Sequence, residues 1–502
     1  MILQQLLWCK LQAAYVSKSD DNNVDCFTIR RVPGYVRSLE SDRKRYDCRI
    51  LPLGLYLRND QDEDNEIEKL KLEVVSIFLQ EFNLLERGWE DFFEQVGKSP
   101  SSGRPTRPLE HFYHDSELEM RTKGNMSSEE LRAVLTFDVV FIAAFYIFRY
   151  KEFGGAAIDF FCGCPRLIHH LNAIFRRDTV WFHLENFHQD IFFLLENQVP
   201  LFMFQNVFRV PIISRRLPEF SFDGFVADIV FHTLKSSGLP HASAVGNDIT
   251  FEDCDHLLAC LHKVVCMDDS TTSSSHRSLS AQRLSCRGTS RKMSRASPLS
   301  VRWTEKSTMP TASELRRVGI RCRGISTGVS GIRFVKSFFR FKAKLYLPKI
   351  AIQGDTDKWL VNMCAYEWMN KEIRPKKLTV FMQIMDNLID TEEDVQLMRR
   401  GRKDEPVIAV HHLGEDKMVA ELFNNLLKNF PHADVSSFED LKSVIDEIQV
   451  WHRSPRRRQV TSFVDRVGAE PWYVVTLLVA FVLLAVAILQ TIYTVWGFYN
   501  QG

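Results

Sequence analysis

Residues 471–502 read PWYVVTLLVAFVLLAVAILQTIYTVWGFYNQG and contain no charged side chain. Thr476 is the only polar residue in the first half of this run. A helix that extends to Trp496 would be about 37 Å long at about 1.5 Å per residue, which is enough to cross a hydrocarbon core of about 30 Å. The stretch therefore predicts a transmembrane helix over 471–496 with a short tail at 497–502.

The ends of the apolar run resemble the two interfaces of a bilayer. Aromatic side chains are enriched where a spanning helix meets the headgroups. Pro471 suits a first helical position, because its missing N–H would be unsatisfied there anyway. A buried helix of a soluble core would usually keep one polar stripe, which this run lacks. The predicted membrane anchor includes Pro471, Trp472, Tyr473, Leu484, Tyr493 and Trp496.

Basic residues lie only on the near side of the anchor. The predicted juxtamembrane segment, residues 453–470, contains Arg453, Arg456, Arg457, Arg458 and Arg466. No Lys or Arg follows the anchor, so the positive-inside bias predicts a tail-anchored protein with its body in the cytosol. The arginines could also bind anionic headgroups, at about 1 kcal/mol each close to the surface. The pattern leaves open whether the membrane is the plasma membrane or an endomembrane.

The composition of the body favours a large folded core in a reducing compartment. The formal net charge is +1, so nothing global points to nucleic acid, and 37 phenylalanines predict a large buried volume. The 11 cysteines are odd in number and irregularly spaced, which does not suit a disulfide framework. The short apolar patch near Leu6 is interrupted by Lys10, so no signal peptide is expected.

The remaining pattern is mainly helical. Helical spacing of apolar residues predicts a body in two halves, 26–266 and 310–452, after a flexible lead-in at 1–25. The run 135–148 is apolar on nearly every side, so a central helix is expected there. Apolar and polar residues alternate over 343–347, which predicts a strand and, with the preceding run, a small antiparallel β-hairpin.

The segment between the two halves has a different composition. Residues 268–308 contain 12 Ser, 5 Thr and 8 Lys or Arg, with few large apolar side chains. Such a composition cannot bury enough surface to offset chain entropy, so a disordered basic insertion is predicted over 267–309. Ser280, Ser294 and Ser297 lie in contexts that suit phosphorylation. A solvated tether without regulation is the equal alternative.

The densest part of the body is residues 190–202, DIFFLLENQVPLF. Five apolar residues run into Glu196, Asn197 and Gln198, and Pro200 then begins a second helix. A carboxylate among aromatics suggests a general base at Glu196. The alternative is that the three polar side chains satisfy backbone groups at a buried helix junction, since unpaired buried polar atoms are costly. We favour the second interpretation because no second carboxylate, His or nucleophile lies at a helpful spacing.

Collinear motifs along the chain resemble a plant family called domain of unknown function 247. The most recognisable is the block containing Asp190, Leu194, Leu195, Glu196, Asn197, Gln198 and Pro200. Others are Arg31-Val32-Pro33, Leu135-Thr136-Phe137-Asp138, Met385-Asp386-Asn387 and Gln490-Thr491-Ile492-Tyr493-Thr494. Two segments, 54–57 and 135–139, depart from the family pattern. The resemblance implies a helical body with a C-terminal anchor and no established chemistry; some grass members are implicated in pollen–pistil self-incompatibility.

Three groups of residues suggest catalysis or metal binding. Ser326 lies in a Gly-x-Ser-x-Gly pattern, but a nucleophile elbow needs a buried strand before it and a helix after it. The alternation of Arg321 and Arg323 before Ser326 does not suit such a strand. The second group is Cys254, His256, Cys260, His262 and Cys266, and the third is Cys162, Cys164, His169 and His170. On one helix, His256 and Cys260 would lie about 120° from His262 and Cys266, so both pairs could not bind one tetrahedral ion.

These observations predict a membrane-anchored protein that acts in recognition or protein–protein interaction. We expect contact with a lipid bilayer and with an unidentified protein partner. Catalysis, a cofactor, a metal, nucleic acid and a small-molecule substrate are not expected. The alternatives are a membrane-tethered hydrolase with a Ser or Cys nucleophile, and a structural scaffold.

Overall fold

The computed structural model describes most of the chain, with gaps. The described residues are 29–30, 32–33, 36–37, 44–54, 66–85, 88–99, 109–114, 128–150, 161, 163–241, 249–267, 309–337, 342–400, 405–410, 415–433, 438–469 and 471–499. The predicted lead-in at 1–25, residues 268–308 of the predicted insertion, Asn125 and the last three residues lie outside them.

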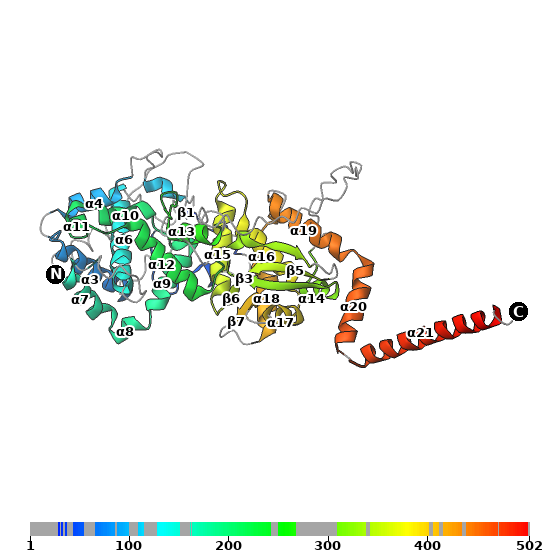
Figure 1. Ribbon diagram of the computed structural model, residues 1–502. Coiled ribbons are helices and arrows are strands. Elements are labelled where there is room, and N and C mark those ends of the chain that lie inside the picture. The colour runs from blue at the N-terminus through cyan, green and yellow to red at the C-terminus, as the bar shows by residue number, and fades with distance from the viewer. Residues whose placement is uncertain are drawn as a thin grey trace.

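The N-terminal half of the chain is a group of helices around one central helix, α6 (Ser128–Tyr150), as Figure 1 shows. Helices α3, α4, α7 and α10 contact α6. This arrangement follows from the sequence, because a helix that is apolar all round has to be covered on every side. The other helices are α3 (Glu66–Glu81), α4 (Trp89–Gly97), α7 (Pro165–Phe175), α8 (Asp178–Trp181), α9 (Leu184–Phe193), α10 (Leu201–Arg209), α11 (Pro211–Ser214), α12 (Phe222–Ser237) and α13 (Leu257–Val265).

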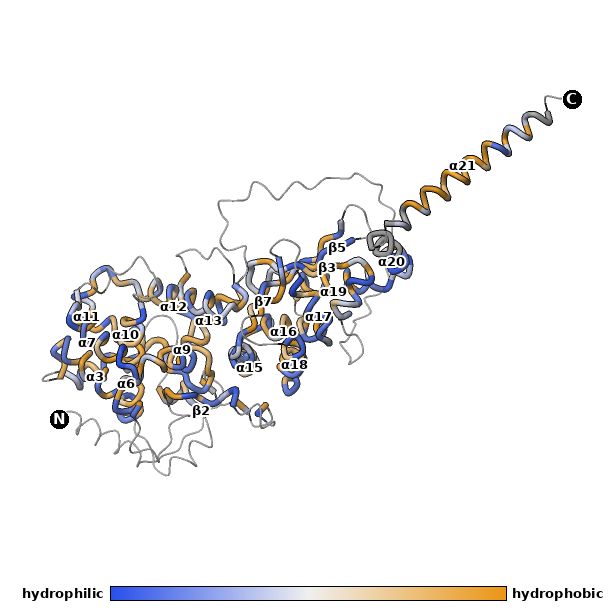
Figure 2. The backbone as a smooth tube through the Cα atoms, turned by 90° about the horizontal axis from the view of Figure 1, so that it is seen from below, coloured by the Kyte–Doolittle hydropathy of each residue, from blue (hydrophilic) through white to orange (hydrophobic). Residues whose placement is uncertain are grey.

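Aromatic rings fill the space around α6. Phe145 meets Phe175 and Phe187 edge to face, with ring centroids 5.7 and 6.2 Å apart. Edge-to-face pairs at such distances add about 0.5–1.5 kcal/mol beyond the area that they bury. Figure 2 shows hydrophobic residues along the helices of this group. The many phenylalanines of the sequence therefore form a packed core, as expected.

The C-terminal half combines helices with a small sheet. Its helices are α14 (Ala312–Arg317), α15 (Thr356–Met369), α16 (Lys377–Leu388), α17 (Glu392–Arg399), α18 (Asp416–Leu426) and α19 (Glu439–His452). Its strands are β3 (Ile320–Ile325), β4 (Arg333–Lys336), β5 (Ala343–Pro348), β6 (Ile350–Ile352) and β7 (Ile408–Val410). The prediction of a mainly helical body is confirmed.

The predicted hairpin is part of a larger, mixed sheet. Strands β4 and β5 pair antiparallel, with Phe334 opposite Leu345. Strand β3 pairs in parallel with the other edge of β5, so the order is β3-β5-β4. The predicted antiparallel pairing is confirmed, but it forms one edge of a three-stranded mixed sheet rather than a separate hairpin. Parallel pairing joins distant segments, so no local pattern in the sequence predicts it. The same holds for β6 with β7 and for β1 (Ile29–Arg30) with β2 (Tyr113–His114).

Two helices extend from the C-terminal half away from the body (Figures 1 and 2). Helix α20 (Pro455–Ala469) contains four of the five basic juxtamembrane residues, and Arg453 lies at the end of α19. Helix α21 (Pro471–Tyr499) is the apolar run. Two helices of the described chain are long and apolar enough to cross a membrane. The window in α6 is 89% buried inside the protein, whereas none of Val475–Trp496 in α21 is buried. Only α21 is therefore available to a bilayer.

Candidate functional site

The most polar part of the buried interior is the junction between α9 and α10. Helix α9 ends at Phe193, a short 3-10 turn covers Leu195–Asn197, and Pro200 precedes the first residue of α10. The family-motif residues Leu194, Leu195, Glu196, Asn197 and Gln198 are all buried. The prediction that Pro200 begins a second helix is confirmed.

Asp190 binds the backbone of a segment far away in the sequence. Its carboxylate accepts hydrogen bonds from the backbone N–H groups of Arg49, Ile50 and Leu51 at 3.1, 2.9 and 3.0 Å. Hydrogen bonds to a charged acceptor are about twice as strong as those between neutral groups. Asp190 therefore fixes residues 49–51 against α9.

Two amide side chains of the junction, Asn197 and Gln198, also bind distant backbone groups. Asn197 accepts from the Leu53 N–H at 2.7 Å and donates to the Leu51 carbonyl at 2.9 Å. Gln198 donates to the Leu194 carbonyl at 2.8 Å and accepts from the Leu258 N–H of α13 at 3.1 Å. Each amide thus serves as donor and acceptor to backbone groups from two parts of the chain.

Glu196 is held in the same way. One carboxylate oxygen accepts the Val32 N–H at 2.6 Å, and the other forms an ion pair with the Arg37 guanidinium. Both oxygens are thereby occupied by structural partners, and the side chain is 1% exposed. This geometry favours the helix-junction interpretation of Glu196 over the general base.

A buried ion pair beside the junction was missed in the sequence. Lys71 of α3 and Asp138 of α6 are both fully buried, and Lys71 Nζ lies 3.3 Å from an Asp138 carboxylate oxygen. The other oxygen accepts the Gly54 N–H at 2.9 Å. Gly54 has φ +61°, a conformation that favours glycine. The signal was available, since Asp138 is the only charged residue between Arg132 and Arg149 of α6.

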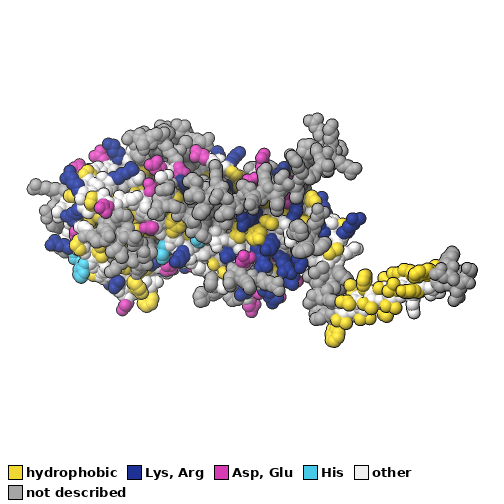
Figure 3. Space-filling view, viewed as in Figure 1, with side chains coloured by type: hydrophobic (Ala, Val, Ile, Leu, Met, Phe, Trp, Pro, Cys, Tyr) yellow, Lys and Arg dark blue, Asp and Glu magenta, His cyan; other side chains and the backbone are white. Residues whose placement is uncertain are grey.

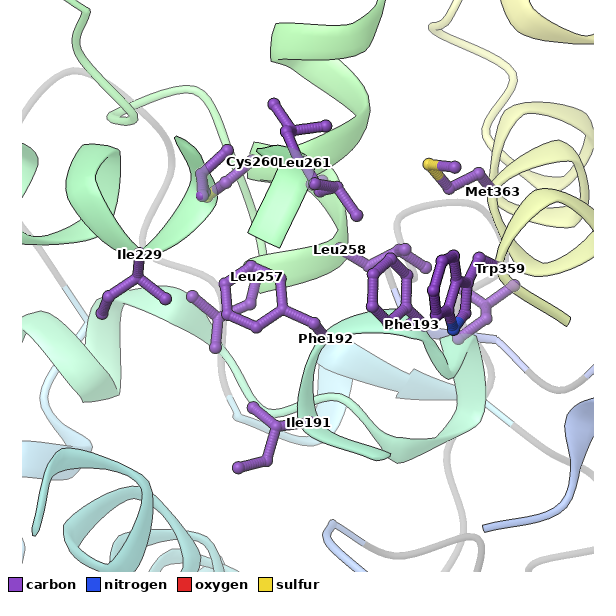
Figure 4. Close-up of a cluster of buried hydrophobic side chains, with 14 of the residues drawn as sticks. Ile191, Phe192, Phe193, Ile229, Leu257, Leu258, Cys260, Leu261, Trp359 and Met363 are labelled. Carbon is purple, nitrogen blue, oxygen red and sulfur yellow. The ribbon is translucent and has the colours of Figure 1, made fainter. Parts of the chain in front are cut away.

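The junction also packs the two halves together. The ring of Phe193 stacks on Trp359 of α15, with centroids 4.6 Å apart, and Figure 4 shows this pair beside Met363. The Asn362 carboxamide accepts the Leu195 N–H at 3.0 Å. Residues of the family motif therefore contact α15 directly.

A polar cavity of about 400 Å³ lies where residues 44–49 meet α15. It is lined by Lys44, Arg45, Asp47, Cys48, Arg49, Asp355, Asp357 and Lys358. Arg45 pairs with Asp357 at 2.9 Å, and Lys358 donates to the Asp47 carbonyl at 2.8 Å. Burial raises the pKa of the Cys48 thiol to about 11, so it stays protonated near neutral pH. The lining is mainly charged groups that bind one another.

The three predicted catalytic or metal groups have different surroundings. Ser326 follows β3, a half-exposed strand, and the next described element is the 3-10 turn Val329–Gly331 rather than a helix. This is not the setting of a nucleophile elbow. In the third group, Cys162 lies outside the described residues, Cys164 is buried, and His169 and His170 are exposed on α7.

The Cys and His residues near α13 separate as the helical geometry predicts. His256 Nδ1 accepts the Ala259 N–H at 3.1 Å and so caps its own helix. His262 and Cys266 instead lie together, with Nε2 3.4 Å from Sγ. Glu367 of α15, which the sequence analysis did not consider, approaches the same Nε2 at 2.8 Å. Burial, followed by the charge of Glu367, raises the pKa of the Cys266 thiol well above its usual value.

The predicted anchor residues are exposed wherever their side chains are described. Trp472, Leu484, Tyr493 and Trp496 are 78, 59, 67 and 61% exposed. Pro471, Tyr473 and Arg466 lie within helices, but their side chains are outside the described part of the structure. Arg457 stacks over the Trp451 ring at 3.5 Å, and Trp451 Nε1 donates to the Val318 carbonyl at 3.0 Å. These contacts connect the juxtamembrane helix to α19 and, through Trp451, to the end of α14.

The outer face of that sheet is basic. In the pairing register, Arg321 lies beside Lys344, and Tyr346 lies between Arg323 and Arg333. Arg333 stacks over Tyr346 at 4.9 Å. Figure 3 shows Lys and Arg side chains gathered on the part of the body nearest to the two C-terminal helices. We refer to Arg321, Arg323, Arg333 and Lys344 as the basic sheet face.

Comparison with known proteins identifies relatives without an assigned activity. A family described as plant protein of unknown function, DUF247, matches residues 29–486. A putative UPF0481 protein of Arabidopsis thaliana is 27% identical over 187 residues, which are 37% of this chain and 33% of that protein. The match thus spans about a third of the length of this relative. No solved structure matches the chain.

Proposed function

The chain belongs to this plant family of unknown function, and from that premise we propose that it is a single-pass membrane protein that acts in recognition. Its body would bind another protein, without catalysing a reaction. A role in pollen–pistil self-incompatibility is the specific form of recognition that the family resemblance suggests. The partner and the process are parts of the proposal.

The observation that carries the proposal is the exposure of α21. Monomeric soluble proteins rarely expose a contiguous apolar patch larger than a few hundred Å². A helix of 29 residues with none of its apolar window buried far exceeds that size. Its backbone hydrogen bonds are satisfied within the helix, which is what a hydrocarbon environment requires. A bilayer is therefore the environment that suits α21.

The charges near α21 support a body on the cytosolic side. Arg453, Arg456, Arg457 and Arg458 precede the helix. Strands β3 and β5, which carry most of the basic sheet face, lie in the half of the body from which α20 and α21 extend (Figure 1). Basic groups near a cytoplasmic leaflet contribute about 1 kcal/mol each through its anionic lipids. We propose that these groups hold the body close to the membrane surface.

The site geometry supports recognition rather than the hydrolase alternative. In a nucleophile–His–carboxylate relay, the acid and the nucleophile contact opposite nitrogens of the ring. Here Cys266 and Glu367 approach the same nitrogen of His262. Because Ser326 does not lie in a nucleophile elbow, Ser326→Ala should leave function unchanged in a folded protein. Loss of function in that variant would favour the hydrolase alternative.

Membrane attachment is tested by removing α21. A chain that ends at Glu470 should leave the membrane pellet in high salt, because salt screens the remaining arginines. A full-length variant with Arg456→Glu, Arg457→Glu and Arg458→Glu serves as the control and should stay in the pellet. If the shortened chain stays in the pellet, the body has another attachment. Reproducible recovery of one partner with the full chain would separate recognition from a scaffold.

A further inference from the structure

Three potential metal ligands converge at the boundary between the two halves of the chain. His262 and Cys266 lie one turn apart at the end of α13, and Glu367 comes from α15. Within the described part of the chain, this is the only group of three His, Cys, Asp or Glu side chains whose ligand atoms all lie within 4.8 Å of one another. The sequence pattern brings together only His262 and Cys266, because Glu367 is 105 residues away from His262.

The spacing of the three atoms is close to that of ligands around one ion. The Nε2–Oε1, Nε2–Sγ and Sγ–Oε1 distances are 2.8, 3.4 and 3.9 Å. Bonds of about 2.0–2.3 Å at tetrahedral angles place N, O and S ligands about 3.3–3.6 Å apart. Shifts of about half an ångström would therefore bring all three atoms to bonding distance of one ion.

The site has the supporting contacts that metal ligands usually have. The second oxygen of Glu367 accepts the N–H and the hydroxyl of Thr379 at 2.8 and 2.7 Å. These bonds fix the carboxylate, as outer partners of metal ligands do. Cys266 is only half-buried, whereas His262 and Glu367 are buried. The group therefore lies nearest to the protein surface at Cys266.

Hydrogen bonding alone satisfies Glu367, whose Oε1 also accepts the Leu378 N–H at 2.9 Å, but it uses the Cys266 thiol poorly. The single proton on Nε2 of a neutral imidazole can bond well to one acceptor, and Glu367 at 2.8 Å takes that place. Cys266 is then left with contacts of 3.4 and 3.9 Å. A shared ion would instead use a lone pair from each of the three atoms.

We propose that His262, Cys266 and Glu367 bind one zinc ion that connects α13 to α15. Imidazole, thiolate and carboxylate are the ligand types of protein zinc sites, and thiolate disfavours calcium and magnesium. One thiolate and one carboxylate balance the two positive charges of the ion. On binding, the Cys266 thiol loses its proton to solvent, and the His262 ring moves its proton from Nε2 to Nδ1 by exchange with solvent. The Nε2–H hydrogen bond to Glu367 is then replaced by one bond from each residue to the metal. Because α13 and α15 belong to different halves, the ion would hold the halves together directly before residues 268–308.

The test uses the full chain in detergent micelles. Zinc chloride is added after chelator treatment, and bound zinc is measured after dialysis. Cobalt chloride is added to a second sample, because a cobalt–thiolate bond produces a charge-transfer absorption that reports Cys ligation. We expect one zinc ion per chain, the cobalt–thiolate band, and a higher thermal midpoint with zinc than without it.

Variants assign the ligands. Cys266→Ser and His262→Gln should each weaken zinc binding at least about tenfold, since even outer-shell changes cost about 10–100-fold. Cys266→Ser should also abolish the cobalt–thiolate band. Cys254→Ser is the matched control: it is a half-buried cysteine of the same segment that lies outside the cluster, and it should bind zinc as the natural chain does. The proposal is overturned if the natural chain retains no zinc, or if Cys266→Ser keeps the natural affinity and the cobalt–thiolate band.

Discussion

Lys71 is a charged residue with no solvent exposure, held by three oxygen partners. Its ammonium contacts Asp138, Glu68 and the Pro52 carbonyl. Transfer of a charge from water into a protein interior costs several kcal/mol, and only such partners offset it. The ion pair therefore connects α3, α6 and residues 52–54. Each of its two charges offsets part of the free energy needed to bury the other.

Removing one member of this pair should be much worse than neutralising both. Lys71→Met should lower the free energy of unfolding by about 3–5 kcal/mol, because Asp138 is left as an uncompensated buried charge. Lys71→Met combined with Asp138→Asn should recover most of that loss, since Asn can still accept from the Gly54 N–H. Urea titration of the full chain in detergent measures both.

The control for this pair is the exposed Lys69, two residues earlier on α3. Lys69→Met should change stability by no more than about 0.5 kcal/mol. An equal loss for the single and the double variant would contradict the ion-pair account.

His188 is fully buried between two hydroxyl groups. Its Nδ1 lies 3.0 Å from the Tyr146 hydroxyl, and its Nε2 lies 3.1 Å from that of Thr233. Thr233 donates to the Ile229 carbonyl at 2.7 Å, so its oxygen accepts from Nε2–H and the Tyr146 hydroxyl donates to Nδ1. A neutral imidazole satisfies this arrangement. Burial, with Arg149 nearby, lowers the pKa of His188 to about 3.

This low pKa predicts a loss of stability in mild acid. The folded state keeps His188 neutral down to about pH 3, whereas in the unfolded chain it binds a proton below about pH 6.5. The stabilisation is therefore complete above pH 6.5 and is lost as the pH falls. Between pH 7 and pH 5 the loss should be about 2 kcal/mol for this residue.

The measurement is the free energy of unfolding at pH 7, 6 and 5 for the natural chain and for His188→Gln. The variant should have a shallower pH dependence over this range. Other titrating groups contribute equally to both proteins, so the difference isolates His188. Parallel curves would refute the assignment.

At the scale of elements, the contact between α9 and α15 is formed by large side chains. Phe193 stacks on Trp359, and Figure 4 shows Leu258 of α13 on the same side. All three side chains are buried. Because protein interiors are packed as densely as organic crystals, a ring removed here leaves a space that its neighbours fill only partly.

Phe193→Ala should therefore cost about 2–5 kcal/mol of unfolding free energy. Leu195→Ala, at the same junction, should fall within the same range of about 2–5 kcal/mol. Phe182→Ala is the control, because Phe182 is 78% exposed, and it should cost no more than about 0.5 kcal/mol. Thermal or urea unfolding of the Phe193→Ala and Phe182→Ala variants measures this difference. A similarly small change in unfolding free energy for both variants would mean that the stacked pair contributes little.

At the scale of the whole molecule, the orientation of the body decides which partners it can meet. Asn125-Met126-Ser127 is the only N-x-Ser/Thr sequence in the chain. A body in the cytosol never meets the glycosyltransferase that modifies such sequences in the secretory pathway. A body on the other side of the membrane would carry a glycan at Asn125.

We expect no glycan, because the arginines before α21 favour a cytosolic body. Protein from plant cells should show the same gel mobility with and without glycosidase treatment. A chain with an added sequon after α21 is the positive control, since its C-terminus would lie on the opposite side. A mobility shift that disappears in Asn125→Gln would reverse the proposed topology and make an extracellular partner the leading hypothesis.

Local patterns in the sequence were sufficient for three of the main helices. The charge-free run predicted α21, the all-round apolar run predicted a buried α6, and Pro200 marked the start of α10. Each signal depends on side chains within a few turns of one another, because helical hydrogen bonds and helical periodicity are local. The sequence also carried the family motifs, which the match over 29–486 confirms.

The partners of the buried polar groups were decided only by the tertiary structure. Asp190 bonds to residues about 140 positions away, Glu196 bonds to Val32, and His262 meets Glu367. The parallel pairing of β3 with β5 was hidden for the same reason. A polar side chain shows in the sequence that it needs a partner when buried, but it does not show which one. That choice depends on how the helices pack, which brings distant segments within hydrogen-bonding distance.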